Sequence, residues 1–127
     1  MSATADLVAF LRARLDEDER IAQAACPAPW IRHEHVAGVH ADDATDGRPY
    51  GSAVADCRRV PDGYGVGNAE HIVRHAPARV LAELEAKRRM IDDTWGGPDH
   101  EDMWLHHMQL LALPYAGHPD YREEWRP

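Results

Sequence analysis

The sequence predicts an α+β fold with three main helices, one short helix and a small antiparallel β-hairpin or sheet. Apolar residues recur at helical spacing over residues 5–25, 77–94 and 100–113, and a shorter helical segment covers 69–75. Residues 30–59 instead combine loose apolar–polar alternation with many turn-forming residues, which favours strands. The 127 residues, 44% of them hydrophobic, suffice for one core, so we expect a single domain over residues 1–127.

The helix at 5–25 is predicted from an apolar stripe with i, i+3, i+4 spacing. The stripe consists of Leu7, Val8, Leu11 and Leu15. Thr4 or Ser2 is the expected N-cap, because a hydroxyl can accept from the free amides of the first turn. The four acids at 16–19 point in four directions on a helix, so they predict a solvated face rather than a metal site.

The β region is predicted to be a hairpin or small antiparallel sheet within residues 30–59. Residues 31–36 alternate loosely, and residues 53–57 form a second apolar run after a turn-rich segment. That segment contains Asp46-Gly47, a dipeptide that favours a hairpin turn because glycine accepts a positive φ without steric cost.

Pro77 divides the centre of the chain into a short helix, 69–75, and a long one, 77–94. A proline disfavours the α conformation at the residue before it and is well placed at the first position of a helix. Asn68 is the expected N-cap of the short helix. The glycine-rich stretch at 60–67 lacks the setting of a dinucleotide fingerprint, so we interpret it as a loop.

The helix at 77–94 carries a single apolar stripe, formed by Val80, Leu81, Leu84, Ile91 and Trp95. Glu83 with Lys87, and Glu85 with Arg89, are i, i+4 pairs in the favourable orientation. Arg88 interrupts the stripe, and we expect it to reach past the core edge or to meet a carboxylate.

The last helix, 100–113, should begin with Asp99 as its cap and Asp102 three residues later. Apolar residues surround much of its circumference, so we expect it to be the most buried helix. They are Met103, Trp104, Leu105, Met108, Leu110 and Leu111. The tail, 114–127, contains Tyr121 and Trp125, and we expect it to lie back over the domain.

The net charge of −8 disfavours nucleic acid as a partner, because there is no basic excess to release counterions from a phosphate backbone. A solvated acidic surface is the commonest reason for such a charge. A basic protein partner and mimicry of a polyanion remain the alternatives.

The chain has no apolar run of the roughly twenty residues that a membrane span needs. Cys26 and Cys57 lack a C-x-x-C spacing and could form at most one bridge. The start of the chain leads directly into a charged helix without the features of a signal peptide, so we expect a cytoplasmic protein with idle thiols.

His71 and His75 are the candidate metal ligands. They lie four residues apart on one helix, so both imidazoles can reach one ion, and zinc is the first ion to test. The glutamate that follows the first histidine in zinc metalloproteases is absent. Further ligands could come from His33, His35, His100, His106 and His107. A chance pair in a chain with nine histidines is the alternative.

Nucleophilic catalysis has weaker support. Cys57 or Ser52 could be combined with a histidine, but neither lies in a recognisable nucleophile motif. The four tryptophans, Trp30, Trp95, Trp104 and Trp125, could line an apolar ligand pocket, although core packing explains tryptophans more often. An enzyme is therefore the less favoured class, and we assign no catalytic residue.

Several segments together resemble an uncharacterised family of short actinobacterial proteins, also found in related phage and mobile elements and known as a domain of unknown function. These segments are DLVAFLRARLDEDERIA, PAPW, the DGRP turn, AEHIVRHAPARVLAELEAKRRM and LLALPYAGHPDYREEWRP. The resemblance implies no activity. His71 and His75 match the family's pattern, whereas Ala28 and Ala76 stand where similar proteins usually have glycine and aspartate.

From these observations we expect a small non-enzymatic accessory or interaction protein with a possible protein partner. A metal-binding protein or metal-dependent hydrolase that uses His71 and His75 is the alternative. An acidic mimic of nucleic acid is the third.

Overall fold

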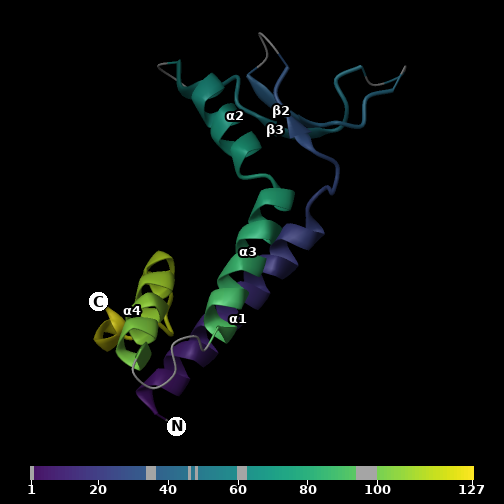
Figure 1. The fold of residues 1–127 in the computed structure, drawn as a ribbon. Coiled ribbons are helices and arrows are strands. Elements are labelled where there is room, and N and C mark those ends of the chain that lie inside the picture. The colour runs from purple at the N-terminus through teal and green to yellow at the C-terminus, as the bar shows by residue number, and fades with distance from the viewer. Residues whose placement is uncertain (1, 34–36, 46, 48, 60–62, 94–99) are drawn as a thin grey trace. The chain divides into compact units, whose positions relative to one another are not determined.

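The computed structural model describes residues 2–33, 37–45, 47, 49–59, 63–93 and 100–127 (Figure 1). Over these residues the chain has four α-helices and a three-stranded antiparallel sheet, which confirms the predicted α+β class. It divides into two compact units, one formed by Met1–Arg20 with Glu83–Pro127 and the other by Ile21–Ala82. None of the helices within the described residues is long and apolar enough to cross a membrane.

Helix α1, Ala3–Ala24, supplies four buried residues to the core of the first unit. Its cap is Ser2, whose hydroxyl oxygen accepts a hydrogen bond from the Ala5 amide at 3.1 Å. Thr4, the other predicted cap, lies within the helix. The buried residues of this part of α1 are Leu7, Phe10, Leu11 and Leu15. Three of the four belong to the predicted stripe, and Phe10 is the addition.

Helix α3, Pro77–Asp92, begins where the proline predicted. In the first unit it runs antiparallel to α1, because Arg12 pairs with Asp92 at 2.7 Å while Arg88 reaches Asp16 and Glu19 at 2.8 Å each. The carboxylate contact expected for Arg88 is thus confirmed. Leu84 and Ile91 of the predicted stripe are buried. Thr94 and Trp95, which were also assigned to this helix, lie outside the described residues.

Helix α4, Glu101–Ala112, differs from its prediction at the start and in its burial. His100 occupies the N-cap position without a side-chain hydrogen bond to the helix, and Asp99 lies outside the described residues. Within α4 only Met108 and Ala112 are buried, so the expectation that this helix is the most buried is wrong. Apolar residues all round its circumference exceed what one neighbouring face can cover, which leaves Met103 and Leu110 exposed.

The C-terminal segment lies back on α1, as its aromatic residues predicted. It contains two short 3₁₀ helices, η3, Leu113–Tyr115, and η4, Glu123–Trp125. Phe10 contacts four of its rings, with centroid distances of 5.1–6.4 Å. These rings belong to Tyr115, His118, Tyr121 and Trp125. Edge-on and tilted aromatic pairs stabilise such a segment beyond the apolar area that they bury.

The sheet of the second unit consists of β1, Trp30–Ile31, β2, Gly38–Ala41, and β3, Ala53–Asp56, in the order β1-β2-β3. Both neighbouring pairs are antiparallel, with Trp30 opposite Ala41 and Val39 opposite Ala55. The sequence predicted strands at 31–36 and 53–57 but not β2. This central strand has four residues between turn-forming ones, too few for a visible alternation.

The connection between β2 and β3 is fixed by Asp43. Its carboxylate accepts hydrogen bonds from the backbone amide and the hydroxyl of Ser52, at 2.6 and 2.7 Å. Gly51 has a φ of +78°, and a β-carbon there would lie 2.0 Å from the Ala41 carbonyl oxygen. Asp46 of the predicted Asp46-Gly47 turn lies outside the described residues.

Helix α2, Tyr64–Arg74, begins five residues earlier than the predicted 69–75. Gly63, at a φ of +77°, precedes it in place of the predicted cap Asn68, which is inside the helix. A β-carbon at Gly65 would lie 2.3 Å from the Cys57 carbonyl oxygen, so the glycine permits α2 to approach β3 closely. The predicted loop at 60–67 is therefore helical from Tyr64.

Candidate functional site

A pocket of about 200 Å³ is formed by one face of α4 and the C-terminal end of α3. It is lined by Met90, Asp93, His100, Met103, Trp104, His107 and Met108. Three of the four methionines of the chain contribute to it. The pocket is therefore rich in thioether groups, with imidazole rings beside them.

The spacing of the α4 residues explains why they share one surface. His100, Met103, Trp104, His107 and Met108 follow i, i+3, i+4, i+7 and i+8 positions, which lie on one side of an α-helix. Met108 is fully buried, whereas Met103 is 55% exposed. Met90, on α3, is 45% exposed. The face is thus apolar and accessible at the same time.

One carboxylate lies at this apolar surface, and two others lie close to it in the sequence, in the first turn of α4. Asp93 lines the pocket, and Glu101 and Asp102 occupy the first turn of α4, where negative charge favours the helix dipole. Both are exposed, and the whole chain has a net charge of −8. A positively charged ligand or partner surface is therefore the electrostatic complement of this face.

The predicted metal ligands His71 and His75 lie together on α2 and its C-cap. Their ring centroids are 4.3 Å apart at an interplanar angle of 36°, and both residues are exposed. The Nδ1 atom of His75 lies 2.8 Å from the carbonyl oxygen of His71. Because a carbonyl can only accept, this Nδ1 carries the proton, and Nε2 of the neutral ring keeps its lone pair for a ligand.

Among the described residues, the other histidines do not complete a metal centre with this pair. His33 packs with His40 and Tyr50 beside the sheet, at centroid distances of 5.1–6.1 Å, while His35 lies outside the described residues. No group of three or more histidine, cysteine or acidic side chains suited to a metal is found among the described residues. From the described residues alone, the pair would hold an ion with two protein ligands and solvent.

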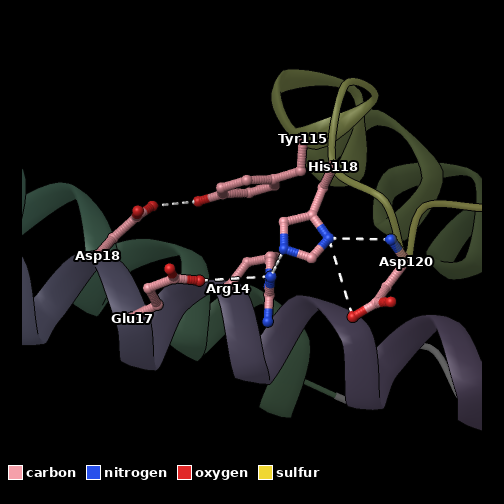
Figure 2. A network of polar contacts seen from close by, with 6 residues as sticks. All are labelled: Arg14, Glu17, Asp18, Tyr115, His118 and Asp120. Atoms are coloured by element: carbon pink, nitrogen blue, oxygen red, sulfur yellow. Dashed lines mark hydrogen bonds and ion pairs between the residues drawn. The ribbon is translucent and has the colours of Figure 1, made fainter.

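A second polar cluster joins the C-terminal segment to α1 (Figure 2). The backbone amide of Asp120 donates to Nδ1 of His118 at 3.0 Å, and Nε2 of the same ring is in contact with the guanidinium of Arg14. Arg14 also pairs with Glu17 at 3.3 Å. Both nitrogens of His118 are occupied within the chain, so this cluster anchors the tail and leaves no imidazole nitrogen for catalysis.

Tyr115 completes the anchor. Its hydroxyl donates to the carboxylate of Asp18 at 2.5 Å, as Figure 2 shows. Partial burial, the hydrogen bond and the negative charge of Asp18 raise the pKa of the Tyr115 phenol above its ordinary value. The phenol therefore stays protonated and serves as a donor rather than as a base.

The two nucleophile candidates have structural roles. Cys57 is buried in an apolar cluster with Val39 and Ala69. The hydroxyl of Ser52 donates to the carboxylate of Asp43 in the turn before β3. Neither arrangement presents an activated nucleophile to a pocket, so the geometry offers no support for covalent catalysis at these residues.

The methionine-lined pocket was missed in the sequence, although part of its signal was visible. The sequence predicted Met103, Trp104 and Met108 to be core residues of a buried helix, and His100 and His107 to be possible further metal ligands. Among the tryptophans that the structure describes, Trp104 lines this pocket, Trp125 is buried against Phe10 and Trp30 packs against the core of the second unit; Trp95 lies outside the described residues.

Comparison with known proteins places the chain by family rather than by activity. No curated protein matches it, and no solved structure matches it either. A family model, described as a family of unknown function, matches residues 4–127, which include the polar anchor, the pocket and the histidine pair. The chain therefore belongs to the family of unknown function DUF6221.

Proposed function

We propose that this chain is a non-enzymatic accessory protein that binds a basic, amphipathic helical segment of a partner protein at the methionine-lined pocket. The observation that carries the proposal is the accessible apolar face of α4, with Met103 55% and Met90 45% exposed at one pocket. Methionine is flexible and polarisable, and it adapts to apolar side chains of different shapes. Such surfaces receive the apolar stripe of an amphipathic helix.

The charge distribution supports a basic partner. Asp93 lines the pocket, Glu101 and Asp102 add negative charge in the first turn of α4, and a net charge of −8 would steer a positively charged segment toward the chain. The two cysteines are free thiols, which fits a reducing compartment, so we place this function in the cytoplasm.

The test is retention of a partner from an extract of the native host at physiological salt. The chain should retain a protein that contains a basic amphipathic segment, and Met103→Glu should abolish retention by placing a charge at the pocket. Leu110→Glu is the matched control, because Leu110 is also on α4 and 43% exposed but does not line the pocket.

A synthetic peptide with the partner's segment should then bind the wild-type chain and the Leu110→Glu variant in a calorimetric titration. Retention of the same partner by Met103→Glu, or the absence of any such partner, would contradict the proposal. Release of the partner by a polyanion such as heparin, together with indifference to Met103→Glu, would instead favour the nucleic-acid mimic.

A metal-binding function at His71 and His75 is the second candidate, supported by the hydrogen bond that leaves Nε2 of His75 available. Zinc accepts imidazole nitrogens at about 2.0–2.1 Å, and helical spacing lets two of them converge on one ion. Metal analysis of protein purified without an affinity tag should find zinc in the wild type and not in the double variant His71→Ala/His75→Ala. Absence of stoichiometric metal from both samples would exclude this function.

A further inference from the structure

The ligand chemistry of the pocket at α3 and α4 differs from that of an ordinary apolar site. Its lining combines the thioethers of Met90 and Met103 with the imidazole of His107. Thioether sulfur is a soft ligand that selects copper(I), and imidazole also suits copper. The geometry points to a binding site for a soft monovalent metal ion, copper(I), at Met90, Met103 and His107.

The positions of these residues allow them to share one ion. Met103 and His107 are separated by one helical turn on α4, so their side chains can lie one above the other on the same face. Met90 adds a second thioether from α3. Both methionines are about half exposed and His107 is exposed, so an ion from solution can reach the three ligands.

Trp104 provides an additional stabilising group in the same lining. It follows Met103 directly and precedes His107 by three residues, on the pocket side of α4. The face of an indole ring attracts cations through its quadrupole, and this attraction is strongest where solvent is displaced. Asp93, also in the lining, adds negative charge that favours a cation.

This ligand set separates the pocket from the histidine pair on α2. Zinc prefers thiolate, imidazole and carboxylate ligands, so the pair of imidazoles at His71 and His75 suits zinc better than the thioether pocket does. The inference uses the same pocket as the proposed partner but does not depend on it. A leucine fills an apolar site as a methionine does, whereas it cannot bind copper.

The test is titration of the full chain with copper(I) under reducing, anaerobic conditions, in competition with a coloured copper(I) chelator. Silver(I) serves as a second probe that needs no reductant. We expect one equivalent to bind the wild type, with quenching of tryptophan fluorescence that Trp104→Phe removes. The Met90→Leu/Met103→Leu variant should bind roughly 10-fold or more weakly.

Two controls locate the site. His106→Gln should leave affinity unchanged, because His106 neighbours His107 but does not line the pocket, whereas His107→Gln should weaken binding. Circular dichroism establishes that each variant is folded. Wild-type affinity in the double leucine variant, or loss of copper binding in His71→Ala/His75→Ala, would overturn the assignment.

The same variants separate this inference from the proposed partner. The double leucine variant should keep the partner and lose copper(I), whereas Met103→Glu should lose both. Failure to find a partner would leave the copper titration unaffected, because the titration uses the purified chain alone.

Discussion

Replacement of Phe10 with alanine should weaken the attachment of the C-terminal segment to α1 more than any surface substitution. Phe10 is 7% exposed and touches four rings of that segment. Removal of a buried phenylalanine side chain costs about 3–5 kcal/mol of unfolding free energy. We expect a value near the middle, about 4 kcal/mol, because the rings around Phe10 can close only part of the space.

This loss is large compared with the total stability of about 5–15 kcal/mol that is typical of a folded chain. Phe10→Leu is therefore the second variant, since it preserves most of the volume and should cost about 1.5 kcal/mol. Urea unfolding, followed by tryptophan fluorescence and circular dichroism, measures both losses. Trp125 makes the fluorescence sensitive to this part of the chain, because its ring centroid lies 5.1 Å from that of Phe10.

Tyr64→Ala is the matched control, because this aromatic residue is 65% exposed and its loss should change stability by less than about 0.5 kcal/mol. A loss for Phe10→Ala below about 1 kcal/mol, or no larger than that of Tyr64→Ala, would refute the packing of the tail on α1.

Three further substitutions or titrations test individual contacts. Because the pKa of the Tyr115 phenol is raised, the stability that this phenol contributes is fully present below the ordinary tyrosine pKa of 10.0 and is lost as the pH rises above that value. In urea unfolding at increasing alkaline pH, the stability difference between the wild type and Tyr115→Phe should therefore shrink. A constant difference would contradict the donor role of the phenol. Ala76→Asp should raise the melting temperature by roughly 3–5 °C, because Ala76 occupies the position before Pro77 and its carbonyl already accepts from the Val80 amide, so an aspartate there can cap α3; an unchanged or lower value in calorimetry would contradict this helix start. Gly51→Ala should lower the melting temperature, since the added β-carbon would meet a backbone carbonyl at 2.0 Å in a conformation with positive φ; wild-type stability would show that this turn can rearrange freely.

The helices that pack through a regular stripe were predictable. The spacing of Leu7, Leu11 and Leu15 was enough to predict α1. Pro77 was enough to predict the start of α3, because a proline is favoured at the first position of a helix. The contact of Arg88 with Asp16 and Glu19 matches one of the two alternatives that its place within an apolar stripe had left open. These features depend on local geometry, which a sequence contains directly.

The features that were missed depend on contacts between distant residues. The early start of α2 depends on Gly65 lying against the Cys57 carbonyl, and neither residue indicates this contact locally. Strand β2 exists because β1 and β3 pair with it on both sides. The burial of α4 was overestimated because the sequence shows how many apolar residues the helix has but not how much surface of neighbouring elements packs against them.

Of the two candidate sites, the histidine pair was predicted from the sequence and the methionine-lined pocket was not. His71 and His75 were brought together by helical spacing, as the sequence predicted, with ring centroids 4.3 Å apart. The pocket needed Met90 from α3 beside the face of α4, and nothing in the sequence joins these positions. A pattern that was interpreted as core is therefore the best candidate for a binding surface.

The central claim, that the methionine-lined pocket is the binding surface of this chain, is tested most directly by nuclear magnetic resonance of methionine methyl groups labelled with carbon-13. The signals of Met90, Met103 and Met108 can be assigned by single leucine substitutions. On addition of the partner's basic peptide, we predict shifts of the Met90, Met103 and Met108 signals. Unchanged signals from the three pocket methionines, under conditions where calorimetry shows the peptide to be bound, would contradict the claim.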